Sequence, residues 1–555
     1  MRLKAKRVRV LFAFFLLLSL LSGCFSACGE TAQTPSGGKT VQMDTVNRTL
    51  KKCKADGFYG TTYEICPYAF ADTNGDGIGD LKGIEKKLDY LNDGKKESEQ
   101  SLGVDGIWLT PVSKAYSYHK YDVVDYKSID PDFGSMEDYE DLIQKCHKRG
   151  MKVYYDLVIN HTSDHHPWFL SAAQYLKSLG DQNPDPSQCP YFDYYHFSRE
   201  QKDGYVKLAG SQWYYEARFW SGMPDLNLDS QAVRSEIKDI MKFWLDRKVD
   251  GFRLDAVTSY YTGDEKANIA FLKWLKDTAE GIRKNVYLVG EAWTNQLEYA
   301  SYYQSGVDSF FDFAFADDSG VITGTSRGSY NALQFAKALV KEEDLYAKNN
   351  PNAINAPFYT NHDMARSAGY YAGMKKARAK TKVAGALNLM TRGNAFVYYG
   401  EELGMKGSGK DEDKRQPMLW TGKKDGKYMC DPPVGSDDVK MVYPAYDKQK
   451  SDPLSIYNYY RNAIRIRSAF PEIAEGKTRV DEKRSTKNTA VMVKEWKGKK
   501  VMLVLNLSKK TEKVDLSGSG FDKLAAVLNV STAEVKYEKK SLTIPSYDIA
   551  VLTEK

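Results

Sequence analysis

The sequence has 555 residues, of which 42% are hydrophobic and 13% aromatic, and its formal net charge at pH 7 is +6. This length and apolar content support a large buried core of more than one ordinary domain. The charge is small for the length, and basic and acidic residues are interspersed, which argues against a nucleic-acid-binding protein.

The N-terminus has the pattern of a secretory signal. Basic residues at positions 2–9 precede an apolar run over 10–21, which is shorter than the about 20 residues of a membrane-spanning helix. The run ends in Leu21-Ser22-Gly23-Cys24, which resembles a bacterial lipoprotein cleavage box. We therefore predict a signal peptide over 1–23 and lipidation of Cys24, which would anchor the protein at the extracellular face of the cell membrane. The alternative is an ordinary signal peptide with a chance cysteine.

A flexible tether and a strand-helix alternation follow in chain order. Residues 24–50 are rich in Ser, Thr, Gly and Lys, which is typical of a tether. Apolar runs predict strands at 62–66, 106–109 and 152–156, and helical spacing predicts helices over 81–91 and 136–148. Such alternation favours parallel βαβ units and an α/β fold.

A long interruption and a later change of pattern divide the chain. Residues 162–230 are rich in Pro, Gly, Asp and aromatics, and a segment this long without alternation is usually functional. After a helix over 232–246, strands are predicted at 251, 286–288, 309–313, 357–359 and 395–398, which completes eight. Short β runs at 490–493, 501–505 and 549–552 predict an all-β module. The predicted barrel thus occupies 51–161 and 231–474, the insertion 162–230, and the β module 475–555.

Three carboxylates each end a short apolar run. They are Asp255 in Gly-Phe-Arg-Leu-Asp-Ala-Val, Glu291 in Tyr-Leu-Val-Gly-Glu-Ala-Trp and Asp363 in Phe-Tyr-Thr-Asn-His-Asp. The carboxyl end of a barrel strand is where (β/α)₈ enzymes carry catalytic groups. Two carboxyls on opposite sides of a sugar bond suffice for glycoside hydrolysis. One such residue alone would be weak evidence, because acidic residues also serve as helix N-caps.

Together with Asp-Leu-Val-Ile-Asn-His at 156–161, these segments resemble in order those of the α-amylase family, glycoside hydrolase family 13. The resemblance runs from about residue 58 to the C-terminus. It implies a (β/α)₈ TIM barrel, a small domain inserted after strand 3 and a C-terminal antiparallel β-sandwich. It also implies a retaining mechanism in which Asp255 is the nucleophile, Glu291 the general acid/base and Asp363 the transition-state stabiliser.

Further residues are expected at the cleavage subsite. Arg253 lies two residues before Asp255, so both side chains point the same way along the strand, and its charge would hold Asp255 ionised. The resemblance implies that Tyr121 stacks on the substrate, although Lys120 precedes it where the family usually has Gly. The predicted substrate-binding residues are Tyr121, His161, Arg253, His362 and Arg366.

An Asp/Gly-rich loop predicts a structural calcium site. Oxygen-bearing side chains alternate at Asp72, Asn74, Asp76 and Asp80, and Ile78 would offer its backbone carbonyl. Family members with this loop bind calcium in it. The bidentate Glu of an EF-hand is missing, and the alternative is a turn in which Asp80 caps the following helix.

The resemblance also bears on the type of enzyme. Ala256 after the nucleophile resembles α-1,4-acting members, and Tyr118 stands where exo-acting oligo-glucosidases usually carry an Asp that closes the glycone end. We therefore expect a monomeric endo-acting α-amylase on starch or maltodextrin. The alternatives are an α-glucosidase or transglycosylase of the same family, and a catalytically silent glycan-binding lipoprotein, which would be expected to lack one of the three carboxylates.

Overall fold

A computed structural model describes residues 41–53 and 57–554. The predicted signal peptide, Cys24 and the tether up to residue 40 lie outside the described residues. Within the described part of the chain, no helix has the length and apolar character needed to cross a bilayer.

Seven parallel strands form the curved sheet of the barrel, in the order β11-β10-β9-β5-β2-β1-β12. Their side chains are almost all buried, as expected for parallel strands covered on both faces. The strands are β1 (Gly60–Ile65), β2 (Gly106–Leu109), β5 (Lys152–Leu157), β9 (Gly251–Leu254), β10 (Tyr287–Gly290), β11 (Ser309–Phe310) and β12 (Asn394–Tyr398).

The remaining gap of the barrel is filled by residues 355–359. The strand predicted at 357–359 lies in this segment, but it is not a regular one. Ala356 makes an isolated parallel bridge with Phe311, which directly follows β11. On the other side, the Phe396 amide of β12 donates to the Pro357 carbonyl at 2.7 Å. Pro357 has no N–H to donate in return, so the ladder is interrupted here although the barrel closes.

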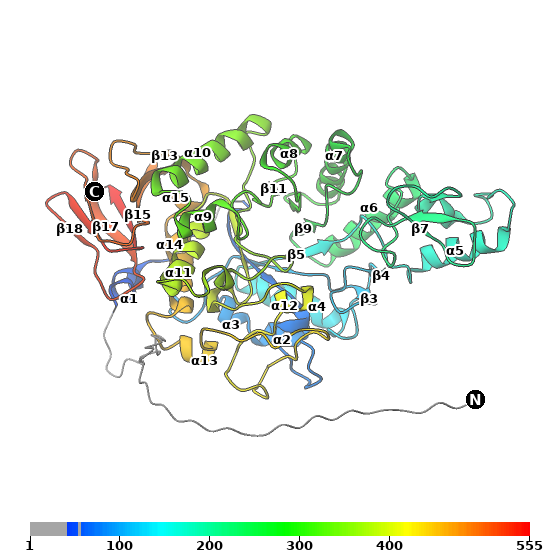
Figure 1. The fold of residues 1–555 in the computed structure, drawn as a ribbon, viewed down its shortest axis with the longest axis horizontal. Helices are drawn as coiled ribbons and strands as arrows, with labels where there is room; N and C mark the ends of the chain where they lie inside the picture. Colours follow the sequence, from blue (N-terminus) through cyan, green and yellow to red (C-terminus); the bar gives the residue numbers. More distant parts are fainter. Residues whose placement is uncertain (1–40, 54–56, 555) are drawn as a thin grey trace, which may run out of the picture. The chain divides into compact units, whose positions relative to one another are not determined.

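Helices surround the barrel strands (Figure 1). Helix α4 illustrates the local pattern, because Ser135 and Asp138 form a capping box and Tyr139, Leu142 and Cys146 lie on its buried face. The barrel helices are α2 (Leu81–Lys86), α3 (Leu88–Leu91), α4 (Met136–Lys148), α6 (Gln231–Asp246), α7 (Glu265–Ile282), α8 (Gln296–Ser301), α9 (Val321–Arg327), α10 (Ala332–Asn349), α11 (Ala377–Leu389), α12 (Asp411–Lys414), α13 (Tyr446–Gln449), α14 (Ile456–Ala469) and α15 (Pro471–Glu475).

The segment after β5 forms the inserted domain. It contains helix α5 (Pro167–Leu179) and a three-stranded antiparallel sheet of β6 (Phe197–Ser198), β8 (Tyr214–Glu216) and β7 (Tyr205–Lys207). A hairpin of β3 (Lys114–Ala115) and β4 (Val123–Asp125) precedes it in the loop after β2. Figure 1 shows the insertion in teal around α5 and β7.

The C-terminal module is a β-sandwich with sheets β13-β14-β15-β20-β17 and β16-β19-β18. All its strand pairs are antiparallel. Its strands are β13 (Lys477–Val480), β14 (Thr489–Trp496), β15 (Lys499–Asn506), β16 (Glu512–Asp515), β17 (Phe521–Leu528), β18 (Lys536–Glu538), β19 (Ser541–Ile544) and β20 (Ile549–Glu554).

Residues 41–50, which the sequence places in the tether, are folded. They form α1 (Gln42–Val46) and the 3-10 helix η1 (Asn47–Thr49). Met43 is fully buried, and the Asn47 side chain donates to the Val527 carbonyl of β17 at 2.8 Å. The N-terminal segment is thus attached to the C-terminal sandwich. The tether predicted over 24–50 therefore does not include residues 41–50.

Candidate active site

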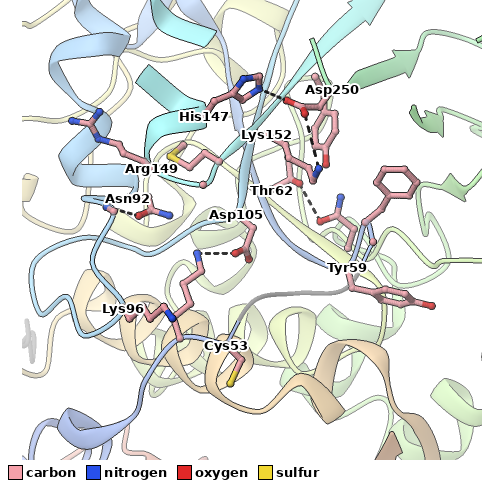
Figure 2. A pocket seen from close by; sticks show the side chains of 18 of the residues that line it. Cys53, Tyr59, Thr62, Asn92, Lys96, Asp105, His147, Arg149, Lys152 and Asp250 are labelled. Carbon is pink, nitrogen blue, oxygen red and sulfur yellow. Dashed lines mark hydrogen bonds and ion pairs between the residues drawn. The ribbon is translucent and has the colours of Figure 1, made fainter. Parts of the chain in front are cut away.

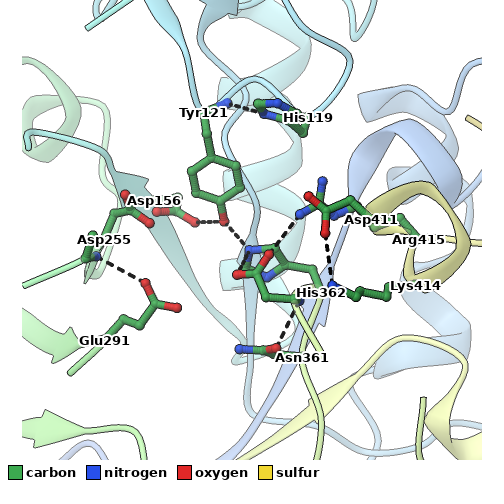
Figure 3. A network of polar contacts seen from close by, with 12 residues as sticks. His119, Tyr121, Asp156, Asp255, Glu291, Asn361, His362, Asp411, Lys414 and Arg415 are labelled. Atoms are coloured by element: carbon green, nitrogen blue, oxygen red, sulfur yellow. Dashed lines mark hydrogen bonds and ion pairs between the residues drawn. The ribbon is translucent and has the colours of Figure 1, made fainter. Parts of the chain in front are cut away.

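A pocket of about 360 Å³ lies among loops that follow the barrel strands, where a barrel carries its chemistry. It brings together residues that are far apart in the sequence (Figure 3). Its lining contains the three predicted catalytic carboxylates and three of the predicted substrate-binding side chains. The residues that line it are His119, Tyr121, His161, Phe219, Met223, Asp255, Ala256, Thr258, Ser259, Glu291, Trp293, His362, Asp363, Asp411 and Arg415.

Arg253 organises the carboxylates from beneath the pocket. Its side chain is 1% exposed. One terminal nitrogen bonds Asp255 and, at 2.9 Å, Asp156, while the other bonds Glu291 at 2.8 Å. Asp255 and Glu291 are therefore held by the two arms of one guanidinium. Arg253 binds carboxylates and does not line the pocket, so its part in substrate binding is indirect.

Asp363 is held by two cationic groups on the other side of the pocket. Arg415 donates to it at 2.9 Å, and His362 Nε2 lies 3.0 Å away. His362 Nδ1 contacts the buried Glu64 of β1 at 2.7 Å, so this imidazole lies between two carboxylates. Although burial opposes protonation, the two acids raise the pKa of His362 to about 10. Burial also disfavours the charged form of Asp363, but His362 and Arg415 hold its pKa well below the ordinary value.

Burial raises the pKa of both Asp255 and Glu291. The pKa of Asp255 is raised to about 6, with Arg253 opposing the effect of burial and Asp156 adding to it. Arg253 thus favours the ionised form as expected, but burial outweighs it. The pKa of Glu291 is raised by burial and by the charges of Asp255 and Asp363, against Arg253. A raised pKa is what a general acid needs near neutral pH.

Tyr121 and His161 form one wall of the pocket. The Tyr121 ring stacks on His362 with centroids 5.3 Å apart and planes 11° apart. Its hydroxyl donates to Asp156 at 3.0 Å and lies 2.8 Å from His362 Nε2. His161 Nε2 is 3.2 Å from the Tyr121 carbonyl, so the two segments that carry these residues are fastened together.

Two non-glycine residues beside the pocket have a left-handed backbone. Ala256 has φ 45°, and its amide donates to Glu291 at 3.1 Å. Lys120 has φ 64°, which explains why glycine is usual at this position. Its buried ammonium pairs with Asp130 at 3.0 Å and Asp132 at 2.7 Å, and these ion pairs stabilise a conformation that costs about 1–3 kcal/mol.

Arg366 does not line the pocket, in contrast to the prediction. It is 2% exposed, and it donates to the backbone carbonyls of Tyr399 at 2.6 Å and Lys414 at 2.8 Å. Lys414 directly precedes Arg415, so Arg366 supports the segment that carries the guanidinium bonded to Asp363.

Sequence reasoning missed Glu64, Asp156, His119 and Arg415. Glu64 and Asp156 are carboxylates inside apolar strands, and a buried charge needs a partner, so they could have been recognised as parts of a network. His119 lies in the loop with Tyr121 and accepts the Tyr121 amide at 3.1 Å. Arg415 lies far along the chain, and no local pattern indicates its place.

A second pocket, of about 550 Å³, lies where the barrel strands begin (Figure 2). Several of its charged groups pair within the pocket, since Lys52 contacts Asp105 at 2.7 Å and His147 contacts Asp250 at 2.8 Å. None of the three predicted catalytic carboxylates lines it. This end of a barrel usually serves stability, so the smaller pocket is the candidate active site.

The Asp72–Asp80 loop uses its oxygens on its own backbone. Asp72 Oδ1 accepts the Gly75 amide at 2.7 Å and Oδ2 accepts the Gly77 amide at 2.9 Å. Asp80 caps α2 by accepting the Gly83 amide at 2.7 Å. Among the residues that the structure describes, no three His, Cys, Asp or Glu side chains are arranged around a common metal position. The donor set is nevertheless all oxygen, and each carboxylate has lone pairs beyond those used here, so the chemistry of the loop suits calcium.

Comparison with known proteins identifies the family. The model of the α-amylase catalytic domain matches residues 64–476, which run from the end of β1 through the insertion and the rest of the barrel. The chain belongs to the α-amylase family of glycoside hydrolases. The matched region ends beside the boundary at 475 between barrel and sandwich.

Individual relatives within this α-amylase family carry more than one activity. Alpha-amylase 3 of Dictyoglomus thermophilum is 38% identical over 456 residues, which cover 80% of this chain and 84% of that protein. Oligo-1,6-glucosidase of Heyndrickxia coagulans is 29% identical over 537 residues, which cover 82% and 92%. The solved structure of Eubacterium rectale Amy13B is 45% identical with a TM-score of 0.89, covering 93% of this chain and 100% of that one.

Proposed function

We propose that this glycoside hydrolase is a retaining, endo-acting α-amylase that cleaves α-1,4 bonds in starch and maltodextrins. The observation that carries the proposal is the arrangement of Asp255 and Glu291 on the two arms of one buried guanidinium. In this reading Asp255 attacks the anomeric carbon, while Glu291 gives a proton to the leaving oxygen and then activates water. Asp363, kept ionised by His362 and Arg415, stabilises the positive charge of the transition state.

The close placement of the two carboxyls supports retention of configuration. Retaining enzymes hold them about 5–5.5 Å apart, whereas inverting enzymes leave about 6.5–9.5 Å for a water. Arg253 contacts Glu291 at 2.8 Å through Nη2 and Asp255 through Nη1, so the carboxyls are neighbours on one planar group. On this shared group a carboxyl separation of about 5–5.5 Å would allow direct attack by Asp255.

Aromatic residues in and beside the pocket support action within a polymer. Tyr118 replaces the Asp of exo-acting relatives, and its hydroxyl accepts from Arg415 at 3.0 Å. Phe219 and Trp293 line the pocket while being 52% and 51% exposed, as expected of rings that receive further sugar units. An α-1,6-glucosidase, suggested by the name of one relative, remains the second candidate.

A substrate blocked at its non-reducing end distinguishes these activities. We expect cleavage of an end-blocked p-nitrophenyl maltoheptaoside and little release from p-nitrophenyl α-glucoside. Release of p-nitrophenol from the glucoside, or of glucose from isomaltose, with no cleavage of the blocked heptaoside would show an exo-acting or α-1,6-acting enzyme.

We also propose that the Asp72–Asp80 loop binds a structural calcium, which the alternation of Asp72, Asn74 and Asp76 supports. A ligand that binds only the folded state stabilises it by about 2.7 kcal/mol at 100 times its Kd. Removal with EDTA should therefore lower the Tm, and added calcium should restore it. Asp76→Ala should show the lower Tm without EDTA. An unchanged melting curve, with no calcium found by elemental analysis, would leave the loop as a turn.

Finally, we propose that Cys24 is lipidated and holds the enzyme at the cell surface. Two acyl chains give stable anchoring where one does not, and a diacylated cysteine would supply both. Cys24→Ala should release active enzyme into the medium or stall its processing. Cys28→Ala, four residues away, is the matched control and should stay with the membrane fraction. Equal membrane fractionation and processed mass in both variants would place the anchor elsewhere.

A further inference from the structure

An exposed set of aromatic rings continues from the pocket over the inserted domain and the adjacent loop between β3 and β4. It begins at Phe219 beside His161, with ring centroids 5.4 Å apart. The next residue, Trp220, is 56% exposed, and Tyr116 is 72% exposed. Tyr116 stacks on His165 at 4.4 Å with planes only 8° apart. We call Trp220, Tyr116 and His165 the aromatic track.

The track is connected and held by backbone contacts. The Trp220 ring lies so close over Gly222 that a Cβ there would be 2.3 Å from the ring. The Gly222 carbonyl accepts the Asp164 amide at 2.9 Å, which places the Trp220 turn beside the segment carrying His165. His165 Nδ1 contacts the Asp164 carboxylate at 2.7 Å, which orients its ring. Each ring of the track thus has at least one contact within the protein: Trp220 with Gly222, His165 with Asp164, and Tyr116 with His165.

The track lies within short reach of the catalytic pocket. His165 is four residues from the pocket residue His161, which limits their Cα separation to about 14 Å. Tyr116 is three residues from His119 in the other segment, and Trp220 directly follows Phe219; His119 and Phe219 both line the pocket. A polymer seated in the pocket has to extend only a short way to meet the track.

We propose that the aromatic track is an accessory binding site for an α-glucan chain whose other part occupies the catalytic pocket. Flat aromatic faces pack well against the apolar faces of glucosyl rings. Adjacent aromatic rings that are exposed to water are typical of a binding surface. The inference rests on the proposed function and extends it, because it makes the enzyme prefer long glucans to short maltodextrins. An α-glucan is the expected ligand because the track adjoins the pocket through His161, Phe219 and His119.

The test compares binding of long amylose and maltotriose in a Glu291→Gln background, which prevents turnover. Tyr116→Ala and Trp220→Ala should each weaken amylose binding by about 3–10-fold and leave maltotriose binding unchanged. Tyr330→Ala removes an aromatic that is 40% exposed between α9 and α10, and it is the matched control. Because Trp220 packs on Gly222, His165→Ala is included as a variant with a smaller effect on folding.

Three outcomes would overturn the track: unchanged amylose binding in all track variants, equal weakening for both ligands, or equal weakening in Tyr330→Ala. Failure of the proposed function gives a different result. In that case wild-type enzyme would not hydrolyse amylose, although amylose binding through the track would still be measurable.

Discussion

Replacement of either catalytic carboxyl is expected to remove nearly all activity on starch. Glu291→Gln should lower kcat about 10²–10⁴-fold, the usual contribution of a positioned general acid and base. Asp255→Asn should be at least as damaging, because the covalent glycosyl-enzyme can no longer form. Thermal unfolding should change little, since burial already disfavours the charged form of both groups. Activity and Tm measured on the same preparations check both statements.

Azide distinguishes the two roles, because it needs no general base to attack. With an activated aryl α-glycoside, Glu291→Gln should yield an α-glycosyl azide, since azide attacks the glycosyl-enzyme formed with Asp255. Asp255→Gly should yield a β-glycosyl azide, because azide then takes the place of the nucleophile. Near-wild-type turnover in either variant, or the opposite azide products, would contradict the assignment.

Removal of the Arg253 charge is expected to affect both stability and pH dependence. Asp156, Asp255 and Glu291 would lose their shared cation, and breaking a buried ion network in this way costs about 3–5 kcal/mol. Arg253→Met should therefore lower the free energy of unfolding by that amount. In residual activity, the acidic limb of kcat/KM, expected near the Asp255 pKa of about 6, should move to higher pH. The direction follows because Arg253 lowers that pKa in the wild type.

Arg253→Lys is the control, because it keeps a positive charge but lacks the two-armed geometry. It should recover part of the lost free energy of unfolding and part of the shift in the acidic limb of kcat/KM. The value of kcat should stay low, because one ammonium cannot hold both carboxyls as the two arms of the guanidinium do. If Arg253→Met unfolds like the wild type and its pH profile is unmoved, the guanidinium does not organise the site.

Most of the fold could be predicted because buried parallel strands are apolar runs separated by helical spacing. The failures have local or distant causes. The predicted strand over 357–359 is irregular since Pro357 cannot donate to its neighbour. The predicted helix over 81–91 is interrupted at Lys87, whose ammonium lies over the rings of Trp420 and Tyr428 at 3.9 and 4.2 Å. Residues 41–50 fold because Met43 and Asn47 find partners in the distant sandwich, which composition cannot reveal.

The candidate site divides in the same way. The predicted residues that line one pocket are Asp255, Glu291, Asp363, Tyr121, His161 and His362. They meet there because each lies at the end of a barrel strand or in the loop that follows one. Of the electrostatic network around them, only the pairing of Arg253 with Asp255 was predicted. Arg415 joins it from the segment after α12, and Arg366 supports that segment. Both placements depend on the packing of residues that are 52 and 48 positions apart in the sequence.

The anomeric form of the first products tests the central claim most directly. Wild-type enzyme should be mixed with amylose in an NMR tube, and the new reducing ends followed before mutarotation equilibrates them. A retaining endo-acting α-amylase should produce α-anomeric maltooligosaccharides first, with the β-anomer appearing later. First appearance of the β-anomer, or no new reducing ends, would contradict the retaining α-amylase mechanism assigned to Asp255 and Glu291.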